Sequence, residues 1–230
     1  EESAEDRRAL AEVRRGELEG ATKILGLSHL YQFGYSDSGM EGWESNKLGE
    51  VFANAEPGEV AEKIARIIRE HQPDVLITYD KKGGYGHPDH LMANRSAMAA
   101  LDVAADPERL GDIPPWRVPK VSHSAWARSR LLRTWRWMPI LGKKTPLDNP
   151  DFDETKYGTP DEEITTRVNV IPVRKKKWSA LFTHKSQIGN NSFWRVFRLA
   201  RRWLYPDESF VIIRSDVDSA KPETSVFDGL

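Results

Sequence analysis

The feature that most constrains the fold is a short apolar run that ends in a glycine-rich turn and leads straight into a helix. Residues 75–79 (VLITY) are rich in β-branched side chains and follow Pro73, which predicts a strand buried on both faces of a sheet. The turn over 80–86 contains three glycines, and Pro88 suits the first turn of a helix predicted over 88–103. A buried strand followed at once by a helix indicates a fold in which helices pack on a sheet.

The rest of the chain extends this alternation. Helices are predicted over 6–25, ending at Gly26, and over 58–71, with a short strand over 29–35 and a loop over 36–57. The pattern predicts an α/β fold with a Rossmann-like, mostly parallel sheet flanked by helices. The second half is irregular. Its predicted strands lie over 118–124, 164–170 and 210–214, and a helix is predicted over 172–185. Residues 126–137 are predicted to form a helix or a cover segment, and residues 139–163 a long loop. No boundary interrupts the pattern, so we predict a single domain over 1–230.

Composition excludes several classes of protein. The 230 residues contain no Cys, which excludes a disulfide scaffold, a Cys-ligated metal and a thiol nucleophile, and fits the cytoplasm, where we place the chain. No apolar run approaches the ~18 residues of a membrane span, so we predict no membrane partner. Residues 1–120 hold 22 acids and 15 bases, whereas residues 121–230 hold 13 acids and 19 bases. We interpret this asymmetry as complementarity within the fold rather than nucleic-acid binding.

The residues that carry chemistry lie where the predicted strand ends and the helix begins, the place where open α/β sheets bind ligands. His87 and His90 are three residues apart, so both rings can reach one side of the helix entry. The positive end of the helix dipole disfavours an imidazolium and keeps the rings neutral, as metal ligation requires. Two His make half of a catalytic zinc site, and Asp89 between them can orient one by accepting its second N–H. From the spacing alone, an ordinary helix start with no metal or catalytic role is an equally good interpretation of these residues.

Weaker candidates lie elsewhere in the chain. Asp37, in the turn after the predicted strand, can accept hydrogen bonds from substrate hydroxyls, although Asp, Ser and Gly also simply make turns. Arg14 on the first helix can clamp a phosphate or carboxylate, but an exposed helix Arg is the commoner case. His184 near a helix end is favoured as a surface or cap residue on its own. The Arg and Trp residues of 126–137 can stack bases and meet phosphates, a less favoured interpretation than a flap over a core.

Two blocks in this order and spacing identify a resemblance. Gly34–Met40 (GYSDSGM) and Gly83–His90 (GGYGHPDH) resemble the LmbE-like, or PIG-L-type, zinc-dependent N-acetylglucosamine deacetylases. The actinobacterial branch, with the mycothiol-pathway deacetylase and the mycothiol S-conjugate amidase, is the most similar. The resemblance continues more weakly through Ala125–Arg130, Ile164–Val168 and His184–Gln187. It implies a zinc-dependent hydrolase that cleaves an amide bond, an N-acetyl bond in the first place, of a glucosamine-type substrate or conjugate.

The resemblance also assigns roles. It implies that His90 ligates the single Zn²⁺ of the chain, that His87 stabilises an oxyanion or acts as a general acid, and that Tyr85 polarises the carbonyl or gates the site. Asp89 completes the predicted catalytic set. The predicted substrate-binding residues are Arg14, Asp37, Met40 and His184.

One departure from the family pattern bears on activity. The family has an N-terminal strand and an A-H-P-D-D-E motif that supplies two further zinc ligands and the general base, and this sequence has neither. We therefore expect the first strand to lie upstream of residue 1 and the domain to be N-terminally incomplete. Two alternatives stay open: a non-catalytic module of the same fold that binds a sugar conjugate, and an anion- or nucleic-acid-binding protein that uses residues 126–202.

Overall fold

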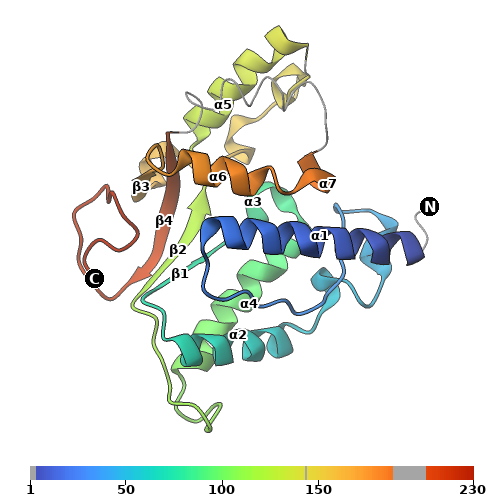
Figure 1. The fold of residues 1–230 in the computed structure, drawn as a ribbon. Helices are drawn as coiled ribbons and strands as arrows, with labels where there is room; N and C mark the ends of the chain where they lie inside the picture. The colour runs from blue at the N-terminus through green and yellow to red at the C-terminus, as the bar shows by residue number, and fades with distance from the viewer. Residues whose placement is uncertain (1–3, 143, 189–205) are drawn as a thin grey trace. The chain divides into compact units, whose positions relative to one another are not determined.

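The structure, a computed structural model, describes residues 4–142, 144–188 and 206–230. These residues form two compact units. The larger unit comprises Tyr35–Val168 and Glu208–Leu230, and the smaller one comprises Glu1–Gly34 and Asn169–Asp207. The ribbon in Figure 1 is coloured along the chain and labels the elements of both. Each unit is described separately below.

A four-stranded sheet organises the larger unit. Its strands are β1 (Val75–Thr78), β2 (Lys120–Ala125), β3 (Thr166–Asn169) and β4 (Asp207–Ser215), in the order β1-β2-β4-β3. β1 and β2 run parallel, and β2 and β4 run antiparallel. The predicted α/β fold is confirmed, with a refinement: the sheet is mixed rather than mostly parallel.

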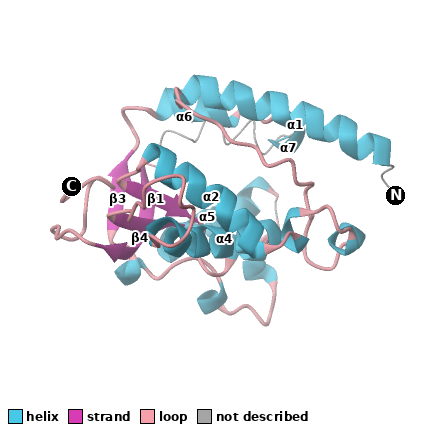
Figure 2. Ribbon diagram, turned by 90° about the horizontal axis from the view of Figure 1, so that it is seen from below, coloured by secondary structure: helices cyan, strands magenta, loops and turns pink. Residues whose placement is uncertain are grey.

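Two helices cover this sheet and build the core with it. α2 (Pro57–His71) and α4 (Pro88–Ala105) lie side by side (Figure 2). Their facing sides present small residues, which let the two backbones approach closely while the apolar surface is removed from water. The buried residues of this core are Ala61, Ala65, Ile68, Ala100, Leu101, Ala104, Val118 and Val121. The predicted helices over 58–71 and 88–103 are thereby confirmed, and Pro88 stands in the first turn of α4 as expected.

A buried arginine closes the carboxyl end of α4. Arg69 lies on α2 with only 2% of its surface exposed. Its guanidinium donates from Nε to the Ala104 carbonyl at 2.9 Å, and from Nη1 to the carbonyls of Leu110 at 2.8 Å and Ile113 at 2.6 Å. Nη2 donates to the carbonyls of Val103 and Asp106. One side chain thus satisfies carbonyls at the helix end that have no partner within the helix.

The second half of the larger unit is held by side-chain clusters. After β2 comes α5 (Arg128–Trp137), where Trp135 packs edge-to-face on Phe152 and Tyr157 from the following loop. The 3₁₀ turns of this unit are Glu44–Lys47, Phe52–Asn54, Met138–Leu141, Pro146–Asp148, Glu154–Lys156 and Asp161–Glu163. In the C-terminal segment, Glu223 accepts a hydrogen bond from buried Lys120 at 2.7 Å.

The smaller unit consists of helices. α1 (Ala4–Leu25) packs with α6 (Arg174–Leu181) and the short α7 (Lys185–Ile188). α1 ends as predicted, because Gly26 adopts a φ of 71° and donates its N–H to the Thr22 carbonyl at 2.9 Å. Glu17 on α1 accepts hydrogen bonds from the N–H and hydroxyl of Ser186 at 2.8 and 2.6 Å. The hydroxyl bond is the main reason that the pKa of Glu17 is lowered.

Three expectations are corrected. The segment 29–35 is not a strand: its residues form no ladder, and a single bridge joins Ser36 to Val51. Its aromatic residues have strand propensity, but propensity yields a strand only where a partner strand is present. The predicted helix over 172–185 is split into α6 and α7. β1 is not buried on both faces, because it is an edge strand and Ile77 is 45% exposed.

Two further expectations concern partners of the chain. Among the described residues, no helix is long and apolar enough to cross a membrane. The segment 126–202, considered above for binding anions or nucleic acid, is described only in part, because residues 189–202 lie outside the described residues.

Candidate metal and catalytic site

The turn that follows β1 is shaped by one aspartate and by glycines. Asp80 Oδ1 accepts hydrogen bonds from the N–H groups of Lys82 at 2.9 Å and Gly84 at 2.8 Å. Gly83, with a φ of 63°, begins the single turn α3 (Gly83–Gly86). A Cβ on Gly83 would lie 3.0 Å from the Leu91 backbone nitrogen, so the turn lies directly against the start of α4. Only glycine combines this φ with so close an approach.

His90 is held with one ring nitrogen fixed and the other directed away from the backbone. Its Nδ1 lies 3.1 Å from the Gly83 carbonyl oxygen. Because a carbonyl oxygen only accepts, Nδ1 carries the proton and Nε2 keeps its lone pair. The ring stacks on Tyr79 with centroids 4.0 Å apart and an interplanar angle of 8°. Desolvation by this packing lowers the pKa of His90, so the neutral, ligating form is favoured.

His87 has the opposite arrangement. It is the N-cap of α4, and its Nδ1 accepts a hydrogen bond from the Asp89 backbone N–H at 3.2 Å. In the neutral ring the proton therefore lies on Nε2, which is 3.9 Å from Asp37 Oδ1. The two imidazole centroids are 4.9 Å apart, so the rings lie together at the corner where the turn after β1 meets the start of α4. One ring presents a lone pair and the other presents an N–H.

Asp89 does not orient His87 through its carboxylate. Oδ2 lies 4.0 Å from His87 Nδ1, too far for a hydrogen bond. Both carboxylate oxygens instead accept hydrogen bonds from Ser38, one from its N–H at 3.1 Å and one from its hydroxyl. The carboxylate of Asp89 therefore ties the loop that carries Asp37 to the start of α4.

Tyr85 closes the outer side of the corner. Its ring meets His90 and His87 edge-on, with centroids 5.2 and 6.0 Å away. The side chain is 64% exposed, so it can meet a ligand from solvent without disturbing the core. The predicted catalytic residues His87, Tyr85 and Asp89 and the predicted ligand His90 thus share one corner with Asp37.

A divalent metal fits part of this donor set. Asp37, His87 and Asp89 each offer an atom within 4.8 Å of the others. However, the single lone pair of His87 Nδ1 already accepts the Asp89 N–H, and each Asp89 oxygen already accepts one hydrogen bond from Ser38. His90 offers a neutral nitrogen whose ring orientation is fixed by a backbone carbonyl, the usual arrangement of a ligating His. The chemistry of the donors therefore fits a metal ligand at His90, with Asp37 at the edge.

The remaining predicted substrate-binding residues are Met40, Arg14 and His184. Met40 lies in the same loop as Asp37, and its carbonyl accepts a hydrogen bond from the Trp43 N–H. Arg14 and His184 belong to the smaller unit, on α1 and just before α7. Their roles, like those of the other site residues, stay predictions.

Ser38 and Asp80 are structural members of the site that the sequence reasoning did not single out. Ser38 is completely buried, although it lies in a loop rich in polar residues. A signal was present for Asp80, because an Asp two residues before a turn position commonly accepts from the following N–H groups. No comparable local signal existed for Ser38, whose partner Asp89 lies 51 residues away.

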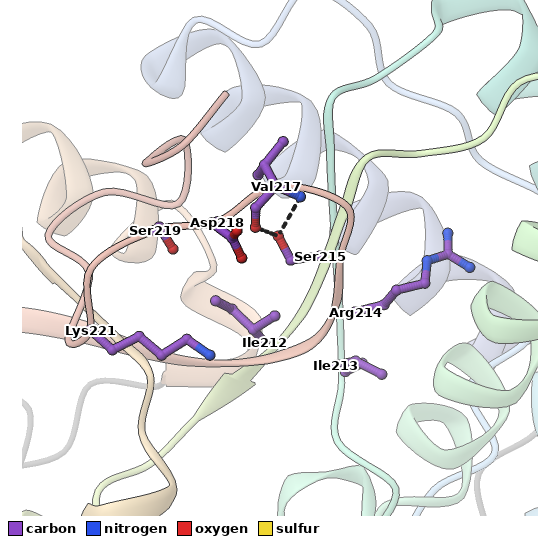
Figure 3. Close-up of a pocket in the computed structure, with 8 residues that line it drawn as sticks. All are labelled: Ile212, Ile213, Arg214, Ser215, Val217, Asp218, Ser219 and Lys221. Carbon is purple, nitrogen blue, oxygen red and sulfur yellow. Dashed lines mark hydrogen bonds between the residues drawn. The ribbon is translucent and has the colours of Figure 1, made fainter.

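A separate pocket of about 340 Å³ lies beside β4. It is lined by the end of that strand and the following loop, where the Ser215 hydroxyl bonds the Val217 carbonyl at 2.6 Å (Figure 3). In the same view Arg214 extends away from the loop, and it donates to the Val118 carbonyl. None of the residues of the candidate site lines this pocket.

Comparison with known proteins finds sequence relatives and solved structures that are similar to the chain. The profile of the family PIG-L: GlcNAc-PI de-N-acetylase matches residues 1–101. A 1D-myo-inositol 2-acetamido-2-deoxy-alpha-D-glucopyranoside deacetylase of Geodermatophilus obscurus is 36% identical over 81% of the chain and 65% of that relative. The enzyme of the same name from Streptomyces avermitilis is 34% identical over 96% of the chain and 78% of the relative. The chain thus spans less than two thirds of the length of the first relative and about four fifths of the length of the second.

Solved structures show the same fold. The conserved protein TT1542 from Thermus thermophilus is similar with a TM-score of 0.53 and 19% identity, over 88% of this chain and 74% of that one. The N,N'-diacetylchitobiose deacetylase from Pyrococcus horikoshii is similar with a TM-score of 0.56 and 17% identity, over 89% of this chain and 64% of that one. The sequence relatives, with the family profile, show that the chain belongs to the PIG-L (GlcNAc-PI de-N-acetylase) family.

Proposed function

We propose that this chain belongs to a metal-dependent hydrolase that removes the acetyl group from an N-acetylglucosamine conjugate. The observation that carries the proposal is the complementary pair of rings, with His90 Nε2 presenting a lone pair and His87 Nε2 presenting an N–H. The activity in the names of the sequence relatives, deacetylation of a 2-acetamido-2-deoxyglucopyranoside of inositol, supports the substrate class. Zinc is the metal that the resemblance implies.

The residues of the corner suggest a division of labour. His90 would hold a divalent ion, which would supply Lewis-acid chemistry at the amide carbonyl and would make water a stronger acid. His87 donates its Nε2 proton to the oxygen that gains charge as the amide carbon becomes tetrahedral, or to the departing nitrogen. Tyr85, exposed beside both rings, adds its hydroxyl as a second donor. Asp37 accepts hydrogen bonds from sugar hydroxyls at the edge of the corner.

Arg14, Met40 and His184 are proposed to bind the remainder of the conjugate, as the family resemblance implies. The further metal ligands and the general base are expected from the A-H-P-D-D-E motif, which the sequence does not contain. A cytoplasmic location and one Zn²⁺ per chain complete the proposal.

The experiment that tests this function removes the proposed ligand. His90→Ala is expected to lower both zinc content and acetate release from an N-acetylglucosaminyl-inositol substrate, the latter by on the order of 100-fold or more. Zinc is measured by elemental analysis and acetate by an enzyme-coupled assay. His71→Ala is the control, because His71 is an exposed residue of the last turn of α2.

The two variants separate the alternatives. Wild-type turnover and full zinc content in His90→Ala would overturn the ligand assignment. A wild-type chain that binds the substrate but releases no acetate would instead support the non-catalytic binding module of the same fold.

A further inference from the structure

Ser38 is the most connected buried side chain of the candidate site. It is completely buried, and its hydroxyl donates to Asp89 Oδ1 while accepting from the Ala53 N–H at 3.0 Å. Its own N–H donates to Asp89 Oδ2 at 3.1 Å. Its carbonyl accepts from the Ser45 hydroxyl at 2.7 Å and from the Asn46 side chain. Every polar group of this residue is therefore used.

These bonds connect two segments that are far apart in sequence. Ser38 follows Asp37 directly, and Asp89 lies two residues after His87. Fixing Ser38 on Asp89 therefore fixes the distance between the Asp37 carboxylate and the His87 ring, which is 3.9 Å between Oδ1 and Nε2. The same Asp89 residue donates its N–H to His87 Nδ1 and so sets which nitrogen carries the proton.

Hydrogen bonds to a charged acceptor are among the stronger ones in a protein, and they gain further when they are shielded from water. Asp89 has 18% of its side chain exposed, and Ser38 is completely buried. Because both Asp89 oxygens accept from Ser38, Asp89 is held in one orientation. The carboxylate is therefore committed to structure rather than to proton transfer.

We infer that Ser38 is a positioning residue, which acts through Asp89 to place the Asp37 carboxylate against the substrate-facing nitrogen of His87. This inference rests on the proposed function, and it deepens it by adding a residue that contacts neither metal nor substrate. It also makes Asp89 a positioning residue rather than a catalytic one. Ser38 and Asp89, joined by two hydrogen bonds, form a clamp between the two segments.

The kinetic test is a double-mutant cycle in the full chain. Ser38→Ala and Asp89→Asn are each expected to lower kcat/KM for acetate release by about tenfold or more, since each removes hydrogen bonds to a charged group. The double variant is expected to be no worse than the poorer single variant, because both changes break the same clamp. Asp89→Asn keeps the test available if Ser38→Ala does not fold.

The split between kcat and KM distinguishes positioning from mere structure. A variant that simply folds less well loses active molecules, so its apparent kcat falls and its KM stays unchanged. Displacing Asp37 and His87 together is expected to raise KM as well as lower kcat. Ser38→Cys keeps a weaker donor at the same place, so its kcat/KM is expected to lie between that of the wild type and that of Ser38→Ala.

Ser96→Ala is the matched control. Ser96 is completely buried on α4, and its hydroxyl makes no hydrogen bond within the described part of the chain. Ser96→Ala is expected to change kcat/KM less than twofold. In the double variant with Asp89→Asn, the two effects on kcat/KM are expected to multiply.

A second measurement does not depend on turnover or on metal. In the metal-free chain, Ser38→Ala is expected to speed hydrogen exchange at least tenfold in both peptides that the clamp joins, 36–54 and 87–91, while Ser96→Ala leaves them at the wild-type rate. Multiplicative effects of Ser38→Ala and Asp89→Asn, or wild-type exchange over 87–91 in Ser38→Ala, would overturn the inference. A wild-type chain without any acetate release would instead overturn the proposed function.

Discussion

The two ends of α4 satisfy their backbone groups in different ways. At the carboxyl end, the guanidinium of Arg69 reaches in from α2 and donates to five carbonyls in and after the helix. At the amino end, the imidazole of His87 accepts the Asp89 N–H, and the His87 carbonyl accepts the N–H groups of His90 and Leu91. One end is closed by a distant charged residue, and the other by its own cap.

This difference separates stability from chemistry. The guanidinium has no donor left over and is buried, so it serves only to hold the core together. The cap at the other end uses one nitrogen of His87 and leaves Nε2 facing Asp37, beside the lone pair of His90 Nε2. A helix end that is closed by local residues can keep reactive atoms directed outward. We therefore expect changes at the two ends to affect different measurements.

The largest expected effect is on stability at the carboxyl end. Arg69→Met keeps the aliphatic volume but removes all five hydrogen bonds of the guanidinium. The Val103 and Ile113 carbonyls lose the donors described for them, whereas the Ala104 and Asp106 carbonyls keep the N–H groups of Trp116 and Arg109. The expected cost is about 4 kcal/mol of unfolding free energy. Urea unfolding monitored by circular dichroism measures this loss. Arg66→Met is the control: its pair with Asp112 is exposed, so the expected cost is about 0.5 kcal/mol. Equal costs for the two variants would contradict the proposed division between the ends.

The sequence predicted one of these ends and not the other. The motif of the amino end is local: Pro88, the three glycines and both histidines lie within eight residues, and spacing alone placed the rings at one corner. The bonds of Arg69 connect residues 34 to 44 positions apart, so no local pattern reveals them. One sign was present, because Arg69 falls four residues after Ala65 on the apolar side of α2.

The same distinction explains the other successes and failures. The helices α1, α2 and α4 were predicted nearly to their ends, the first two from their apolar periodicity and α4 from Pro88 at its first turn. The strand expected over 29–35 failed because strand formation depends on a partner that the local sequence cannot name. The exposure of Ile77 and the clamp between Ser38 and Asp89 likewise depend on which segments become neighbours. Local chemistry was predictable, and its support from distant residues was not.

The second prediction concerns the fit of the turn against the amino end of α4. Gly83→Ala forces a side chain into a φ of 63° and places its Cβ 3.0 Å from the Leu91 backbone nitrogen. The expected cost is about 2 kcal/mol in unfolding free energy, together with a loss of activity, because the Gly83 carbonyl orients His90. Gly16→Ala in α1 is the contrasting change, because nothing lies within 4 Å of its Cβ position. It is expected to stabilise by up to about 1 kcal/mol, and a cost there would contradict the steric argument.

The smallest effect is a pH dependence that belongs to the amino end alone. Desolvation lowers the pKa of His90 in the folded, metal-free chain, whereas the unfolded chain has an ordinary His pKa near ~6.5. Between these two values the unfolded chain binds more protons, so stability is complete above the unfolded pKa and falls as the pH drops through the folded one. His90→Gln is expected to flatten this part of the stability curve, measured by urea unfolding between pH 5 and 8 at about half-unit steps. Arg69→Met does not change His90, so the curve of Arg69→Met should run parallel to that of the wild type, only lower. A curve for His90→Gln that stays parallel as well would show that the ring is as well solvated in the folded chain as in the unfolded one.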